Sequence, residues 1–203
     1  MTDRVLLATR SEGKLRELRA LFAGYSIDVV DLRTEGVLET DAEDDLEQYE
    51  SFNENALAKG RYFNALSGLP VVADDSGLEV RALGGVPGVR SKRWSGRQDL
   101  TGDALDAENN ALLLRSLAGM SDRAARYVCA AAFVDGSREI VCRGEVAGHI
   151  TSAPRGSGGF GYDPYFESDE LARTFAEVSG DEKVAVSHRG RAFRALIDEL
   201  RRG

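Results

Sequence analysis

Short apolar runs that suit buried strands alternate with helical patterns along the chain. Such runs lie at residues 5–9, 27–32 and 71–73, and periodic apolar residues predict helices over residues 15–22 and 45–66. Strands that alternate with helices favour an α/β fold, in which helices cover a sheet.

The second half of the chain adds a long hairpin. Residues 126–134 and 139–150 are strand-like, and the Asp135-Gly136 pair between them suits a tight antiparallel turn. Helices are predicted over residues 101–117 and 189–202. These patterns together predict an α/β fold: a mixed β-sheet with flanking helices and a cleft between two lobes.

The composition is that of a folded chain. Its 203 residues are 42% hydrophobic and 30% charged, which excludes disorder as the main state. Without a repeat or linker, we expect a single domain over residues 1–203, with no independent second domain.

The net charge of -8 repels a phosphate backbone, so no nucleic acid partner is expected. No apolar run has membrane-spanning length and no cleavable signal is present, so we expect a cytoplasmic protein without a membrane partner.

The two cysteines, Cys129 and Cys142, lie in the strand-like runs of the hairpin. They form no CxxC motif and have no histidine at the spacing of a zinc site. We expect both to be reduced core residues.

The loop after the first strand has the composition of a phosphate site. It reads Thr9-Arg10-Ser11-Glu12-Gly13-Lys14: Gly13 allows close approach of an anion, helix-start amides can donate, and Lys14 adds positive charge. It is not a Walker A loop, because Ala8 and Leu15 replace its first glycine and its Ser/Thr. The alternative is an ordinary helix start with a surface lysine.

Two adjacent carboxylates follow the apolar run at residues 71–73. Asp74 and Asp75 are expected at the end of a buried strand, followed by Ser76, and ligands bind at strand ends in open α/β sheets. Adjacent carboxylates repel unless a cation compensates, and an oxygen-rich site suits Mg²⁺ shared with substrate phosphates. Successive strand residues point to opposite faces, so one carboxylate is expected to face the ligand.

A glycine-rich loop carries two aromatic residues at positions 156–164. Pro164 stands where the helix of a dinucleotide-binding motif would begin, which excludes that interpretation. Phe160 and Tyr162 can stack on a flat base, and Asp163 can accept a hydrogen bond from its N–H. A glycine loop with core aromatics is the alternative.

A third group of polar residues lies around the start of the last predicted helix. His188 and Arg189 can donate to a carbonyl oxygen, and Lys183 can pair with a phosphate or with carboxylates. No serine or cysteine stands in a nucleophile motif, so a Ser-His-Asp enzyme is not expected.

In their order, these motifs resemble the inosine/xanthosine triphosphate pyrophosphatase family, whose members hydrolyse deaminated purine nucleoside triphosphates to monophosphate and pyrophosphate. The resemblance covers almost the whole chain. The matching segments are Leu7-Ala8-Thr9 to Lys14, Phe52-x-Glu54-Asn55-Ala56, Ala73 to Leu78, Leu83 to Gly88, Gly158 to Pro164, and Ser187-His188-Arg189-Gly190. Ser11 is a departure, since the family usually has Asn there.

The resemblance implies a homodimer of elongated two-lobed subunits, with an active site in the cleft that depends on Mg²⁺, Mn²⁺ being possible. It implies that Asp75 is the proton acceptor and a metal ligand, and that Lys183 is catalytic. A second metal ligand is implied before Phe52, where Glu47 is the nearest match and the other acids of residues 39–50, including Glu43, Asp44 and Asp45, stay open. The residues implied to bind substrate are Thr9, Arg10, Ser11, Glu12, Gly13, Lys14, Ser76, Phe160, Gly161, Tyr162, Asp163, Lys183, His188 and Arg189.

The implied reaction is water attack at the α-phosphorus, with pyrophosphate as the leaving group. Donors from His188 or Arg189 would face the 6-oxo group of the base, and Asp163 would accept from a ring N–H. The 6-amino group of adenine would leave such donors unpaired, which discriminates against it. The alternatives are a pyrophosphatase for modified pyrimidine or for all triphosphates, and a nucleotide sensor that does not cleave.

Overall fold

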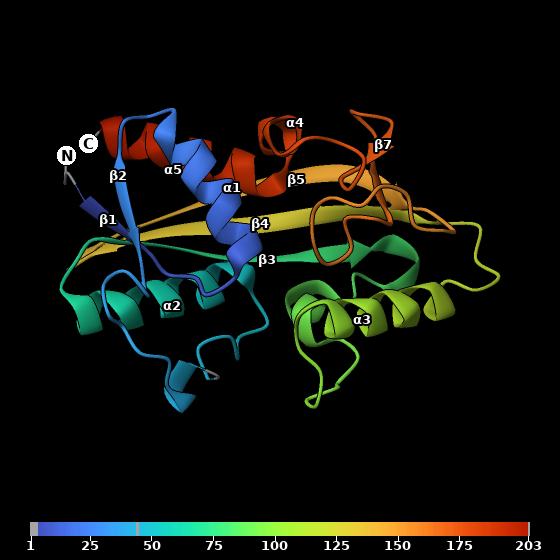
Figure 1. Cartoon of the computed structure of the whole chain (residues 1–203), viewed down its shortest axis with the longest axis horizontal. Coiled ribbons are helices and arrows are strands. Elements are labelled where there is room, and N and C mark those ends of the chain that lie inside the picture. The colour runs from blue at the N-terminus through green and yellow to red at the C-terminus, as the bar shows by residue number, and fades with distance from the viewer. Residues whose placement is uncertain (1–3, 44, 203) are drawn as a thin grey trace. The chain divides into compact units, whose positions relative to one another are not determined.

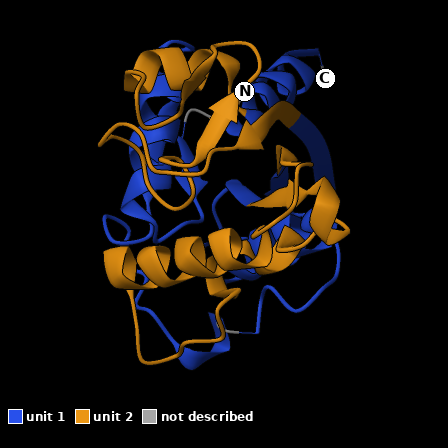
Figure 2. Ribbon diagram, turned by 90° about the vertical axis from the view of Figure 1, so that its right-hand side faces the viewer, with its two compact units in different colours: residues 1–75, 129–144, 188–203 blue, residues 76–128, 145–187 orange. Residues whose placement is uncertain are grey.

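A computed structural model of the chain describes residues 4–43 and 45–202. The chain divides into two compact units (Figure 2). Unit 1 comprises residues 1–75, 129–144 and 188–203, and unit 2 comprises residues 76–128 and 145–187. The single domain over residues 1–203 and the cleft between two lobes stay predictions.

The strands form a seven-stranded mixed sheet of order β2-β1-β3-β4-β5-β6-β7. They are β1 (Arg4–Leu7), β2 (Asp28–Asp31), β3 (Val71–Val80), β4 (Ala124–Asp135), β5 (Arg138–Ile150), β6 (Phe166–Ser168) and β7 (Arg173–Thr174). β1 is parallel to β2 and β3, whereas β6 is antiparallel to β5 and β7. The predicted α/β fold with a mixed sheet and flanking helices is confirmed.

Unit 1 contains α1 (Glu12–Ala23), α2 (Phe52–Ser67) and α5 (His188–Arg202). In Figure 1, α1 and α5 lie on one side of the strands of this unit and α2 on the other. The Ser11 and Ser51 side chains cap α1 and α2 by accepting from the third backbone N–H of each helix. Gly68, with φ of 68°, ends α2 in the left-handed conformation that favours glycine. The core cluster of unit 1 consists of Leu6, Ala8, Leu32, Phe63, Val71 and Ala73.

Unit 2 contains α3 (Gly102–Ser116) and α4 (Gly180–Val186). α4 begins with a capping box, in which Ser179 and Glu182 each accept from the other's backbone N–H. An aromatic cluster of Tyr127, Phe166 and Phe175 packs within its core. The short 3-10 helices of the chain are η1 (Asp41–Glu43) in unit 1, and η2 (Arg81–Leu83) and η3 (Gly88–Arg93) in unit 2.

Two predicted elements differ from the structure at positions that bear on the site. The helix expected over residues 45–66 begins only at Phe52, because Ser51 caps it and residues 45–51 form turns and bends. The strand expected over residues 71–73 continues to Val80. Asp74 and Asp75 therefore lie inside a buried strand, and their expected place at a strand end is wrong.

Cys129 and Cys142 are free thiols. Cys129 is buried as predicted, whereas Cys142 is only partly buried, so it is wrong to call both of them core residues. Across residues 4–43 and 45–202, no helix has both the length and the apolar character needed to cross a membrane.

Candidate active site

Asp74 lies among cationic side chains of unit 1. Its Oδ2 is 3.0 Å from Lys14 Nζ and accepts from Arg189 Nε at 3.2 Å, and the residue is 1% exposed. Burial alone would raise the pKa of this carboxyl, but Lys14, Arg189 and Lys59 together hold it well below its ordinary value. Asp74 is therefore a permanent anion that positions cations, and it is unsuited to accept a proton.

Asp75, the next residue of β3, has the opposite proton affinity. It is 4% exposed, and its Oδ2 accepts a hydrogen bond of 2.9 Å from Asn55 Nδ2. Burial and the charge of Glu47 raise its pKa to about 6, against the opposing effects of Lys59, Lys14 and Asn55. A carboxyl with this pKa can accept a proton near neutral pH, which is the property of a general base.

Lys59 connects the two aspartates to Glu47. Its Nζ donates to Glu47 Oε1 at 2.5 Å and to the backbone oxygen of Asp74 at 2.8 Å. Burial lowers its pKa, but Glu47, Asp74 and Asp75 outweigh burial, so the net shift is upward and the ammonium stays charged. Lys59 was not predicted from the sequence. A signal was available, because Lys59 lies one helical turn after Asn55 of the matched segment, on the same side of α2.

Asn55 ties the acidic loop to Asp75. Its amide donates to Tyr49 O at 3.1 Å and accepts from Tyr49 N at 2.9 Å, in addition to its bond with Asp75. The loop that carries Glu47 is thereby fixed against the N-terminal part of α2. Of the alternative acids, Glu43 pairs with Arg10 and Asp45 accepts from Gln48, while Asp44 lies outside the described residues.

The pair Asp75 and Glu47 fits a divalent cation. Glu47 is close enough to Asp75 for its negative charge to raise the pKa of Asp75. A cation between the two carboxylates would remove this repulsion. In residues 4–43 and 45–202, no cluster of three or more His, Cys, Asp or Glu side chains could hold a metal ion. Two carboxylates suffice for Mg²⁺, which is commonly bound by one or two of them together with substrate phosphates.

The loop predicted to bind phosphates has hydrogen bonds among its own residues. Thr9 Oγ1 accepts from Ser11 N at 3.2 Å, and Ser11 Oγ accepts from Lys14 N at 3.4 Å. Lys14 directs its ammonium to Asp74, whereas Arg10 binds Glu43 and the backbone of Val37. The remaining predicted residues are Glu12, whose side chain is 70% exposed, and Gly13 in the first turn of α1.

The start of α5 brings two predicted residues into the core of unit 1. His188 and Arg189 are both 3% exposed. Arg189 Nη1 donates to Glu17 Oε2 at 2.5 Å, and burial, which lowers the pKa of Arg189, is outweighed by Glu17 and Asp74. A Cβ on Gly144 of β5 would lie 2.2 Å from His188 O, so the close packing of α5 on β5 requires glycine there.

In unit 2, Lys183 holds the loop predicted to bind the base. Its Nζ lies 2.5 Å from Asp163 Oδ2 and 4.6 Å from the centre of the Phe160 ring. The same Asp163 oxygen accepts from Phe160 N at 2.8 Å. Lys183 and Asp163 are nearly fully buried, so this contact fixes residues 160–163, here called the base loop.

The two aromatic residues of the base loop are unequal. The Tyr162 hydroxyl donates to Ser91 O at 2.7 Å, and burial followed by the charge of Asp106 raises the pKa of Tyr162. Tyr162 is 5% exposed, whereas Phe160 is only half-buried and is the more accessible ring. Ser76, the remaining predicted residue, follows Asp75 in β3 and is half-buried.

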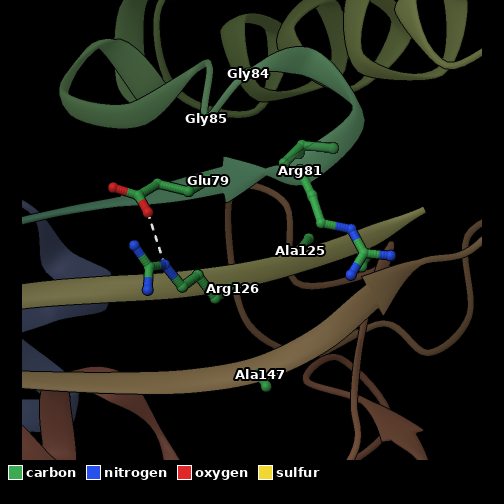
Figure 3. Close-up of a pocket in the computed structure, with 9 residues that line it drawn as sticks. Glu79, Arg81, Gly84, Gly85, Ala125, Arg126 and Ala147 are labelled. Carbon is green, nitrogen blue, oxygen red and sulfur yellow. Dashed lines mark hydrogen bonds and ion pairs between the residues drawn. The ribbon is translucent and has the colours of Figure 1, made fainter. Parts of the chain in front are cut away.

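A separate cavity of about 460 Å³ lies in unit 2 beside Glu79, Arg81 and Arg126 (Figure 3). Arg126 forms an ion pair with Glu79, and Arg81 forms one with Asp122. None of the predicted site residues lines this cavity.

Comparison with known proteins places this chain in a family. The model of the Ham1 family matches residues 5–199. The chain is 46% identical over 201 residues to a dITP/XTP pyrophosphatase of Ralstonia nicotianae, covering 98% of this chain and 96% of the relative. A dITP/XTP pyrophosphatase of Frankia alni is 49% identical over 203 residues, covering 98% of this chain and 97% of the relative.

Solved structures agree with the sequence relatives. A HAM1 protein from Coxiella burnetii superposes with a TM-score of 0.84 at 35% identity, over 100% of both chains. With sequence, fold and family model in agreement over nearly its whole length, the chain belongs to the Ham1 family.

Proposed function

We propose that this chain hydrolyses deaminated purine nucleoside triphosphates (dITP, ITP, XTP and dXTP) to the nucleoside monophosphate and pyrophosphate. The observation that carries the proposal is the group formed by the buried Asp75 with Glu47 and Lys59. Asp75 accepts from Asn55 at 2.9 Å, and Lys59 donates to Glu47 at 2.5 Å and to the backbone oxygen of Asp74 at 2.8 Å. Relatives that match nearly the whole chain are named dITP/XTP pyrophosphatase. Such an enzyme removes damaged nucleotides from the cellular pool.

In the proposed reaction, the oxygen of water attacks the α-phosphorus and the bond from phosphorus to the α,β-bridging oxygen breaks. Asp75 takes the proton released by the water, and pyrophosphate leaves. Lys14 and the first-turn amides of α1 bind phosphate oxygens. Mg²⁺ held by Asp75 and Glu47, with Mn²⁺ as the alternative, would supply positive charge against the triphosphate.

Base selectivity is proposed to depend on hydrogen-bond polarity. His188 or Arg189 would donate to the 6-oxo group, and the base loop would hold the ring beside Phe160. Adenine presents a 6-amino donor to these donors, and a mismatch of buried groups discriminates by about 10⁴-fold or more where it is complete. The contacts of Lys183 with Asp163 and Phe160 favour a part for Lys183 in holding the base loop; its part in catalysis stays a prediction.

The remaining proposals concern the setting of the enzyme. We propose a cytoplasmic homodimer whose only other partner is the nucleotide, with no nucleic acid and no membrane. The net charge of -8 supports the absence of a nucleic acid partner.

A panel of substrates tests the function. Pyrophosphate release is measured from the triphosphates of inosine, xanthosine, adenosine and guanosine with Mg²⁺, with EDTA as the control. We expect rapid release from inosine and xanthosine triphosphates only, and none with EDTA. Equal release from all four would contradict base selectivity, and no release from any of them would favour a nucleotide sensor.

A further inference from the structure

Gly161, in the middle of the base loop, has both of its backbone polar atoms bound by side chains of α3. Gly161 N donates to Asp106 Oδ2 at 2.7 Å, and Gly161 O accepts from Asn110 Nδ2 at 2.9 Å. Asp106 and Asn110 are four residues apart, so they lie on the same face of α3. All three residues belong to unit 2.

The two hydrogen bonds fix two successive peptide groups. The N–H of Gly161 belongs to the peptide that follows Phe160, and its C=O belongs to the peptide that precedes Tyr162. Gly161 has a φ of 62°, in the left-handed region, where glycine has no side chain to restrict rotation of these peptides. Contacts from outside the loop must therefore set their orientation, and α3 provides them.

We propose that Asp106 and Asn110 are positioning residues for base recognition. By fixing the peptides on both sides of Gly161, they set the direction in which the loop presents Phe160. The proposal rests on the proposed function, in which this loop holds the base.

The other supports of the loop act at different points. Lys183 and Asp163 hold the end of the loop, and Phe160 N donates to that same carboxylate. The Tyr162 hydroxyl is bound to Ser91 O. The backbone of Gly161 is bound by α3, so loss of the α3 contacts is expected to loosen the middle of the loop while its ends stay attached.

Asn109 offers a matched control. It is the neighbour of Asn110 on α3, is 2% exposed, and also binds backbone through its amide. Its contacts are with Ser95 N and Lys92 O, both at 2.9 Å, and therefore with a segment other than the base loop. A substitution at Asn109 removes the same number of amide groups from the same helix.

The test compares Asp106→Ala, Asn110→Leu and the control Asn109→Leu by kcat/KM for inosine and adenosine triphosphates, with urea unfolding of each variant. We expect Asp106→Ala and Asn110→Leu each to lower kcat/KM for inosine triphosphate about tenfold. The value for adenosine triphosphate, which does not use the base contacts, is expected to change little. The ratio between the two substrates therefore falls about tenfold, whereas Asn109→Leu keeps it.

Asp106→Asn is the conservative variant, because an amide oxygen can still accept from Gly161 N. We expect it to restore the substrate ratio to within about twofold of the wild type. If Asp106→Ala does not fold, Asn110→Leu still tests whether the substrate ratio falls, and Asp106→Asn still tests whether a hydrogen-bond acceptor at position 106 is enough to keep it.

Two results would overturn the positioning role: an unchanged ratio in both Asp106→Ala and Asn110→Leu, or an equal fall of the ratio in Asn109→Leu. A wild-type chain that does not prefer inosine to adenosine triphosphate contradicts the proposed function itself. The two failures are thus distinguished by the wild type alone.

Discussion

Adjacent aspartates of one strand have opposite proton affinities because their surroundings differ. Asp74 is surrounded by Lys14, Arg189 and Lys59, which keep it ionised despite its burial. Asp75 is buried beside Glu47, and its pKa rises to about 6. Neighbouring carboxyls whose pKa values are pushed apart in this way commonly divide the work of a site. Here Asp74 positions cations and Asp75 is suited to accept the proton.

The raised pKa of Asp75 predicts how stability depends on pH in the metal-free protein. The folded state binds the proton with a pKa of about 6 and the unfolded chain with 3.8, so wild-type stability falls as pH rises between these values. Above pH 6 the cost is about 3 kcal/mol. Asp75→Asn removes it, so the variant is expected to be more stable than the wild type at pH 8.

Urea unfolding in EDTA measures this difference. We expect the gap between Asp75→Asn and the wild type to be about 3 kcal/mol at pH 8 and to vanish below about pH 3, where Asp75 is protonated in both states. A wild type that is as stable as the variant at pH 8 would show that Asp75 is not destabilised by ionisation.

Lys59 is expected to be essential because it lies, largely shielded from solvent, among three acidic groups. Lys59→Met removes the ammonium that binds Glu47 and opposes the rise in the pKa of Asp75. We predict that kcat for inosine triphosphate falls by about 10²-fold or more. The control is Arg61→Met on the same helix, which breaks the exposed ion pair with Glu139 and is expected to be nearly neutral. Steady-state kinetics of both variants check this prediction, and a kcat of Lys59→Met similar to that of Arg61→Met would contradict it.

At the scale of the element, periodicity and turn residues predicted much of the fold. The helix after the first strand and the hairpin at Asp135-Gly136 lie where expected, because their apolar spacing and turn chemistry are local properties. The length of β3 was missed, because Asp74 and Asp75 interrupt its apolar pattern. Only cations from α1, α2 and α5, distant in the sequence, make these carboxylates tolerable inside a strand.

The same reasoning explains which of the residues proposed for the site could be predicted from the sequence. Asp75 and Lys14 stand in short motifs whose residue types indicate their chemistry. Lys59 and Asp106 lie within helices, where a charged side chain is usually a solvated surface residue. Their contacts with Asp74 O and Gly161 N arise only from the tertiary fold.

The packing of α5 on β5 supplies a prediction at this scale. Gly144→Ala would place a Cβ 2.2 Å from His188 O and 2.5 Å from Ala192 N, and must push the start of α5 away. We expect the free energy of unfolding to fall by about 1–3 kcal/mol, together with a loss of activity through His188 and Arg189. Urea unfolding and kcat/KM for inosine triphosphate are measured.

Gly24→Ala is the control, since its Cβ would meet Leu21 O at 3.4 Å, an ordinary contact. This variant is expected to keep both stability and activity. Equal effects of the two substitutions would show that the close approach at Gly144 does not matter.

At the scale of the whole molecule, the residues proposed for the site come from both units. Unit 1 contains the carboxylates and cations proposed to act on the triphosphate, and unit 2 contains the base loop with Lys183 and α3. The Ham1 family model and the relatives extend over both units, so the activity is expected of the whole chain.

The proposed homodimer predicts the mass in solution. Sedimentation equilibrium is expected to give twice the mass of the chain at micromolar concentration. A single-chain mass that persists as the protein concentration rises would remove the dimer from the account.

Isotope transfer tests the central claim most directly. Inosine and adenosine triphosphates are hydrolysed together in water labelled with ¹⁸O, and the products are analysed by mass spectrometry. Attack at the α-phosphorus with selection of the deaminated base predicts one labelled oxygen in inosine monophosphate, unlabelled pyrophosphate and little adenosine monophosphate. Label in pyrophosphate or orthophosphate, or equal labelling of the two monophosphates, would contradict it.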